Sequence, residues 1–340
     1  MDEAHARRLS AAAAAHRAQL GTDAEAQRTA ELSAAAGSLS DAIQTLRRIG
    51  DGEAALTMAG DLSVFWQDAG LVQMGRAVTE MALTELTEQG IPRARAALAA
   101  SELAFRQGDQ AATSRWAEEA IELATAHGAP AVAGRARINL ARMSFRDEDA
   151  DGIDKHLAAA EAVAGDDLSV RRGILHMRAW EAYVRGDVQE ARRRFAASKE
   201  HAERGGDRFT AASEGANLAD LTLEAGNVGA AIAPLADALA VATELGSRYL
   251  ALGLVESIAR CALLSGRAEE ALTLVTALDA AYHDAGLLGD PTEEGDRHAV
   301  GDEAALIIGV ERAEASRVRG AAMTYADMVG VATAVLRSAS

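Results

Sequence analysis

The sequence predicts an all-α protein, built as a right-handed solenoid of helix hairpins with a period of about 40 residues. Two observations carry this prediction. The chain has only 4 prolines and 4% aromatic residues among 340, and it is rich in alanine, the residue with the highest helix propensity. In addition, a glycine followed by a turn residue recurs at nearly fixed intervals, and a repeat of this length indicates stacked supersecondary units.

The turn glycines define the repeat. Gly186, Gly226 and Gly266 are spaced by 40 residues, and Gly108 lies 78 residues, close to two units, before Gly186. A glycine after a helix C-terminus can take the left-handed conformation in which the last carbonyls are capped. Asp or Asn follows three of these glycines, and such a side chain can cap the next helix. The missing copy falls at Glu148, where acidic residues replace the glycine.

When the repeats are aligned on the turn residue, the side chains at fixed positions before it predict the structure of one repeat unit. The residue seven positions before each turn is always small, which lets paired helices approach closely. The second helix of each unit is amphipathic, as Trp116, Ala120 and Leu123 show, so neighbouring units must stack to bury it. Each unit is therefore expected to be a helix A, a turn and a helix B. The small column is Ser101, Ala141, Ala179, Ala219 and Ala259.

The chain is expected to have three regions. Residues 1–49 form two or three N-terminal capping helices, with breaks near Gly21 and Gly37. Residues 50–286 carry the helix-hairpin repeats, and residues 287–340 form a loop and C-terminal capping helices. Terminal repeats are expected to differ from the inner ones because they face water.

The C-terminal region carries two local signals. Residues 287–296 are rich in Gly, Asp and Pro and predict a loop. The last helix is expected to start at Thr324, where Asp327 stands three residues later in a capping-box-like arrangement.

Charge and composition disfavour several classes of partner. The net charge of −17 argues against nucleic-acid binding, since phosphate binding is driven by clustered Lys and Arg. No stretch approaches the ~20 apolar residues of a membrane span, and the N-terminus lacks the order of a signal peptide. We expect a cytoplasmic protein with no direct nucleic-acid or membrane contact. The single cysteine, Cys261, is expected to be a buried structural thiol.

The motifs of common catalytic and cofactor sites are absent from the sequence. It has no Gly-x-x-x-x-Gly-Lys phosphate loop, no His-Glu-x-x-His and no Gly-x-Ser-x-Gly. No two histidines lie four residues apart, so a helix-borne zinc pair is unsupported. We expect no cofactor and no catalytic residue.

One acidic segment matches half of a calcium-binding loop. Asp147, Asp149 and Asp151 precede Gly152 in the order Asp-x-Asp-x-Asp-Gly, which presents carboxylates to a hard cation. The twelfth loop position, where calcium sites place a bidentate Glu, is Ala158. Two interpretations stay open: an acidic solvated turn, which the missing ligand favours, and a weak calcium site.

The columns resemble those of the tetratricopeptide repeat, whose helix A carries an Asn nine residues and a small residue seven residues before a Gly-Asp turn. Asn139 and Asn217 stand at the first of these positions. The family's usual period is 34, so the resemblance implies longer helices here.

A closer resemblance covers nearly the whole chain. The segments 50–56, 65–66 and 75–83 look like the start of the repeat region in the C-terminal part of LuxR- and SARP-type ATPase transcriptional regulators. The far end, from Ile308 to Met328, resembles that family's closing helices. The resemblance implies the repeat module of such regulators. Without a phosphate loop or a separate helix-turn-helix segment, it does not carry ATP hydrolysis or DNA binding to this chain.

The family geometry places helices A on the concave face of the solenoid, which selects candidate groove residues. Guanidinium groups bind carboxylates through paired hydrogen bonds, and an indole offers a flat apolar surface. We expect the first six candidates to cluster on one stretch of the inner wall; the alternative is a set of solvated charges paired with nearby acids. The candidates are Arg106, Asn139, Arg142, Arg146, His176, Trp180, Asn217, Asp220 and Arg260.

Two functions follow from these residues. The first is a non-catalytic interaction or sensor module, linked to transcriptional regulation, which binds a protein or peptide segment in its groove. The second is the same scaffold repurposed for a small anionic or aromatic molecule, as a sensor or as an enzyme of specialised metabolism. An open groove favours the first function, and a closed apolar pocket of several hundred Å³ favours the second.

Overall fold

The structure is a computed structural model that describes residues 1–22, 24–288 and 291–339. All nineteen regular elements in these residues are α-helices, and no strand occurs among them. The predicted all-α class is confirmed. The chain divides into two compact units, Met1–Arg194 and Phe195–Ser340. The division falls within α12 (Val188–Arg204), and each unit is described by itself.

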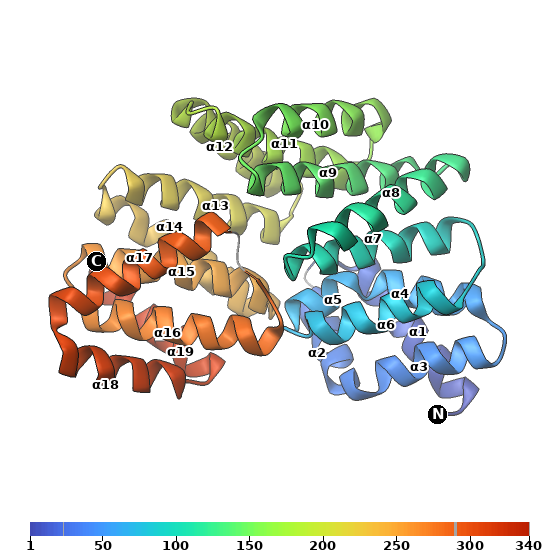
Figure 1. Cartoon of the computed structure of the whole chain (residues 1–340), viewed down its shortest axis with the longest axis horizontal. Coiled ribbons are helices and arrows are strands. Elements are labelled where there is room, and N and C mark those ends of the chain that lie inside the picture. Colours follow the sequence, from blue (N-terminus) through green and yellow to red (C-terminus); the bar gives the residue numbers. More distant parts are fainter. Residues whose placement is uncertain (23, 289–290, 340) are drawn as a thin grey trace. The chain divides into compact units, whose positions relative to one another are not determined.

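Five helices of the first unit form a row in which each packs on the next, here called the A row (Figure 1). They are α1 (Glu3–Ala18), α4 (Gly52–Asp61), α7 (Ile91–Arg106), α9 (Pro130–Arg146) and α11 (Leu168–Val184). Other helices pack beside this row and alternate with it along the chain. They are α2 (Glu25–Ala34), α3 (Ala36–Arg48), α5 (Ser63–Asp68), α6 (Val72–Glu85), α8 (Gln110–Ala126) and α10 (Ala150–Ala164).

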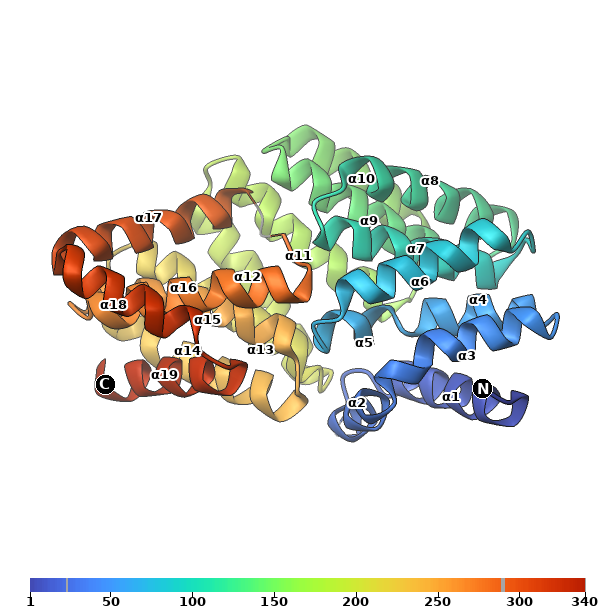
Figure 2. The ribbon, with the colours of Figure 1, turned by 60° about the horizontal axis from the view of Figure 1, so that its bottom comes forward.

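The second unit continues the alternation of packed helices. Each of α13 to α16 packs on the next one in the chain, α17 and α18 pack on α16, and α19 packs against α14, α15 and α16 (Figure 2). Cys261 lies fully buried among these helices, as expected for a structural thiol. Burial raises the pKa of its thiol above the ordinary value. The helices are α13 (Arg208–Glu224), α14 (Val228–Leu245), α15 (Arg248–Leu264), α16 (Ala268–Ala285), α17 (Pro291–Ile308), α18 (Val310–Ala321) and α19 (Tyr325–Ala339).

The predicted turns share one hydrogen-bond pattern. At the first of them the amide of Asp109 donates to the carbonyl of Ala104 at 3.1 Å, closing the helix end in a Schellman-type turn. Glu148 occupies the same turn position with φ of 52°, the one positive φ of a non-glycine residue in the described chain. The amide after it, of Asp149, donates to the carbonyl of Ser144 at 2.8 Å. The turn therefore forms even where the glycine is missing.

The residue after the turn caps the next helix, as predicted. The side chains of Asp109, Asp149, Asp187 and Asn227 each accept a hydrogen bond from the backbone amide three residues later. A second set of turns, not anticipated from the sequence, connects helices B to the next helices A. Its left-handed glycines are Gly128, Gly206, Gly246 and Gly286.

The small column lies at the packed centre of the helices. All five of its members are at most 2% exposed. Ser101 adds a polar link: its hydroxyl donates to the carbonyl of Thr113 at 2.8 Å and accepts the amide nitrogen of Asn139 at 2.7 Å. This chain joins α7, α8 and α9 through buried hydrogen bonds.

Three local expectations need correction. The second N-terminal break falls at Ala35, and Gly37 lies inside α3, because the chain turns with only one residue between α2 and α3. The predicted loop 287–296 is shorter, since α17 begins at Pro291, a favourable first helical residue. Residues 289–290 of that loop lie outside the described residues.

The third correction concerns membrane spans. α14 is long and apolar enough to cross a membrane by length and composition, whereas we predict no such stretch from the sequence. In this structure α14 packs on α13, α15 and α19. Its apolar side chains contact these neighbouring helices, as those of a core helix do. The capping box at the start of α19 is confirmed. The amide of Thr324 donates to Asp327, and the amide of Asp327 donates back to the hydroxyl of Thr324.

Candidate functional site

The nine groove candidates are divided between the two units. Six lie in the first unit on three neighbouring helices of the A row, α7, α9 and α11. The other three, Asn217, Asp220 and Arg260, lie in the second unit on α13 and α15. We therefore build the site from the first unit alone.

Arginine and aromatic side chains from α7 and α9 interleave. The guanidinium of Arg146 lies over the ring of Phe105, 3.7 Å from its centroid, and donates to the carbonyl of Phe105 at 2.7 Å. That carbonyl lies in the last turn of α7 and also accepts from the amide of Gly108 at 3.0 Å. Arg146 thus stabilises the α7–α9 contact through a cation–π interaction and a hydrogen bond. Arg106 lies on the same ring at 5.6 Å and donates to Gln67 at 2.9 Å.

The aromatic part of the face joins α9 to α11. The rings of Phe145 and Trp180 lie 4.8 Å apart, and Tyr183 meets the indole edge-on at 5.6 Å. The indole N–H donates to Nε2 of His176 at 3.1 Å, so that nitrogen is the acceptor and His176 carries its proton on Nδ1. Phe145, Trp180 and Tyr183 are all partly exposed. We name Arg106, Arg142, Arg146, Phe145 and Trp180 the arginine–aromatic face.

The candidate positions chosen from the sequence did not include these aromatic residues, although a regular spacing in the sequence marks them. Phe105, Phe145 and Tyr183 each stand three residues before a turn position. Four of the six first-unit candidates, Arg106, Arg146, His176 and Trp180, make the contacts described above. Arg142 lies on α9 near Glu102, whose pKa it helps to lower. Asn139, by contrast, is only 1% exposed, and its amide nitrogen donates to the hydroxyl of Ser101. It therefore links α9 to α7 and does not face a groove.

An ion-pair cluster of residues outside the candidate set lies beside this face on the A row. Asp61 accepts from Arg95, and Glu102 accepts from Arg135 and from the hydroxyl of Ser63. Burial would raise the pKa of Glu102, but Arg135, the Ser63 hydrogen bond and Arg142 together hold it below the ordinary value.

Part of this cluster could have been found by extending the columns. Arg95 and Arg135 stand one heptad before Glu102 and Arg142, and residues seven apart share a helix face. The cluster also takes Arg17 from α1 and Asp61 from α4, two helices that precede the first aligned turn at Gly108.

The second-unit candidates form a different environment. Asn217 donates to Glu214 at 3.0 Å, and Arg260 pairs with Asp296 at 2.9 Å. Asp220 is partly exposed on the same helix as Asn217. Asn217 and Arg260 each have a carboxylate partner, and this set contains a single arginine.

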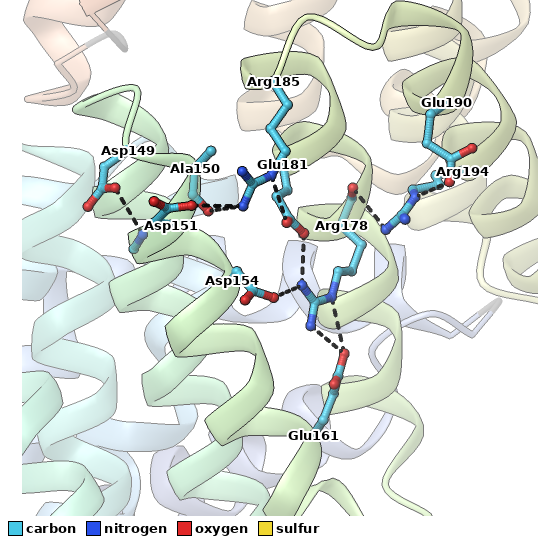
Figure 3. Close-up of polar contacts among 11 residues, drawn as sticks. Asp149, Ala150, Asp151, Asp154, Glu161, Arg178, Glu181, Arg185, Glu190 and Arg194 are labelled. Carbon is cyan, nitrogen blue, oxygen red and sulfur yellow. Dashed lines mark hydrogen bonds and ion pairs between the residues drawn. The ribbon is translucent and has the colours of Figure 1, made fainter.

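Two carboxylates that follow Glu148 pair with arginines toward the C-terminal end of α11 (Figure 3). Asp151 pairs with Arg185 at 3.1 Å, and Asp154 pairs with Arg178 at 2.6 Å. The carboxylate of Asp149 accepts a hydrogen bond from the amide of Gly152 at 2.9 Å and so caps α10. The carboxylates thus have separate protein partners. Among the described residues, no group of three or more His, Cys, Asp or Glu is arranged to hold a metal ion.

Two surface hollows lie away from the candidates. One, of about 410 Å³, is lined by Arg93, Arg115 and neighbouring acids of α8. Another, of about 600 Å³, is lined by residues of α3 with Met1, Glu85 and Leu86. Both are open and polar, and neither is lined by a groove candidate. Neither hollow has the form of an enclosed apolar ligand pocket.

Comparison with models of protein families and with curated proteins finds no match for this chain.

Proposed function

We propose that this chain is a non-catalytic helical-repeat module that binds an acidic polypeptide segment on the arginine–aromatic face. One observation carries the proposal: α7, α9 and α11 place arginines and partly exposed aromatic rings side by side on a protein whose net charge is −17. Guanidinium groups pair with carboxylates, and flat rings accept the apolar parts of a peptide.

The proposed architecture is a right-handed solenoid of tetratricopeptide-like hairpins with a period of about 40 residues. The alternation of the A row with neighbouring helices and the recurring turns support it. In this proposal the A row lines the concave face. The resemblance to LuxR- and SARP-type regulators supports a role in transcriptional regulation in the cytoplasm, where the module contacts a protein partner rather than nucleic acid.

A small anionic or aromatic ligand is the second candidate. The Trp180–Phe145 pair favours it, because stacked rings with arginines nearby can hold a planar anion. The open, polar character of the described hollows favours the extended segment instead. A peptide needs no enclosed cavity, since it can bind along a row of helices.

The test is a binding isotherm for a fluorescein-labelled, glutamate-rich peptide containing one Phe, followed by fluorescence anisotropy. The variant Arg106→Gln/Arg142→Gln removes two charges but keeps long polar side chains. We expect it to weaken binding by at least about tenfold, because each charge-assisted hydrogen bond contributes about 1.5–3 kcal/mol. Binding should also weaken as salt rises.

The matched control is Arg8→Gln/Arg317→Gln, which removes the same charge at exposed sites on α1 and α18. It should leave the isotherm nearly unchanged. Equal losses in both double variants would show that only net charge matters and would refute this face as the site. Arg146 is left intact because its contacts with Phe105 stabilise the fold.

A further inference from the structure

Three arginines and two carboxylates from four A-row helices meet beside the arginine–aromatic face. Asp61 is 3% exposed, and its Oδ1 accepts from Nη2 of Arg95 at 2.5 Å. Glu102 is 9% exposed, and its Oε1 accepts from Nη2 of Arg135 at 2.7 Å. Nε of Arg17 lies 3.6 Å from Asp61, beyond hydrogen-bond distance. We name these five residues the Arg17 cluster.

The Arg17 cluster contains one more positive than negative charge. Each guanidinium offers five N–H donors, and within the described chain Arg17 has no contact to a carboxylate closer than the 3.6 Å to Asp61. Charges removed from water are ordinarily paired. Burial, and then the neighbouring Arg135 and Arg95, lower the pKa of Arg17 to about 10. Arg17 shares Asp61 with Arg95, so the five residues carry a net charge of +1.

An anion from solution can reach the cluster. The side chains of Arg17, Arg95 and Arg135 are 27%, 29% and 23% exposed. Polar contacts also connect the cluster to the proposed peptide site. Glu102 accepts from Ser63 at 2.6 Å, Ser63 accepts from Gln67 at 3.4 Å, and Gln67 accepts from Arg106 at 2.9 Å.

We propose that the Arg17 cluster is a subsite for one carboxylate of the bound acidic segment. This inference rests on the proposed function and adds a position at which the segment must carry an acidic group. A carboxylate supplies one negative charge, matches the excess charge of these five residues, and is the anionic group that an acidic segment carries.

The test uses the same glutamate-rich peptide and two variants with opposite expected effects. Arg17→Gln removes the excess charge and should weaken binding by about tenfold. Glu102→Gln keeps hydrogen-bonding groups toward Arg135 and Ser63 but adds to the excess positive charge, and should strengthen binding several-fold. A network that only stabilises the fold would lower binding in both variants. Thermal unfolding by circular dichroism establishes that each variant is folded, and Arg17→Lys should recover part of the affinity.

The outcomes separate this inference from the proposed function. If Arg106→Gln/Arg142→Gln weakens binding but Arg17→Gln does not, the subsite is wrong and the face stands. If the wild-type chain does not bind the peptide, both are wrong. A matched peptide carrying phosphoserine that binds more tightly, in a manner abolished by Arg17→Gln, would overturn the carboxylate assignment in favour of a phosphate monoester.

Discussion

At the scale of single residues, Glu148 shows what the repeat tolerates. It holds a φ of 52°, a left-handed conformation that elsewhere in the described chain belongs to glycine. That conformation costs an L-residue about 1–2 kcal/mol. The turn still forms because the Schellman-type hydrogen bond and the Asp149 cap are both made there.

Replacing Glu148 by glycine should therefore stabilise the first unit. We expect a gain of about 0.5–1 kcal/mol in the free energy of unfolding, since relief of backbone strain exceeds the added flexibility of the unfolded chain. Urea unfolding followed by circular dichroism measures it. As a control, Gly186→Ala at φ of 80° should destabilise the protein. A stability loss in Glu148→Gly would mean that the glutamate side chain itself contributes to the turn.

His16 is a second residue whose environment has a measurable consequence. It is fully buried in α1, with Nε2 3.2 Å from the hydroxyl of Thr29 and its ring edge-on to Phe65. Burial lowers its pKa from 6.5 to about 4. Because the pKa is lower in the folded state, the neutral ring stabilises the fold above pH 6.5, and this stabilisation is lost as pH falls toward 4.

The lowered pKa of His16 predicts that the folded protein is less stable in acid. Between pH 7 and pH 5 the protein should lose roughly 2 kcal/mol of stability through His16 alone. Urea midpoints at the two pH values, compared between the wild type and His16→Leu, measure the contribution of this residue. A pH dependence that is unchanged in the variant would assign the acid sensitivity to other groups.

At the scale of helices, the small residues seven positions before each turn allow the helices to pack closely. Ser101 adds hydrogen bonds to this packing. Its hydroxyl is the middle of a buried hydrogen-bond chain from Asn139 on α9 to a carbonyl on α8. The column predicted a small residue here, and the requirement for close helix approach is general. Serine is needed here, and not alanine, because its hydroxyl accepts from Asn139. Only the packed structure shows that these two side chains lie within hydrogen-bond distance.

Ser101→Ala should accordingly destabilise the first unit although alanine fits the column. The amide of Asn139 would lose its described partner in a buried position, at a cost of about 1–3 kcal/mol. The double variant Ser101→Ala/Asn139→Leu should recover part of this loss, because it removes the stranded donor. Equal stability of Ser101→Ala and the wild type, measured by urea unfolding, would show that the hydrogen-bond chain contributes nothing.

At the scale of the whole molecule, local sequence rules predicted the helices, turns and caps, because each depends on residues close in the chain. The same rules placed Arg106, Arg142, Arg146 and Trp180 on one set of helices. They could not assemble the Arg17 cluster, since Arg17 and Asp61 come from helices that precede the first aligned turn and meet Arg95 only through tertiary packing. The calcium-like motif has a related limit. Asp149 caps its own helix, which the segment encodes, but Asp151 pairs with Arg185 at the end of α11, which the segment does not encode.

Photo-crosslinking tests the central claim most directly. The glutamate-rich peptide, carrying a photoreactive group at its Phe position, is bound to the full chain, irradiated and mapped by mass spectrometry. The proposed face predicts crosslinks concentrated in α7, α9 and α11 and lost on competition with unlabelled peptide. Competable crosslinks confined to the second unit, or to helices outside the A row, would contradict it.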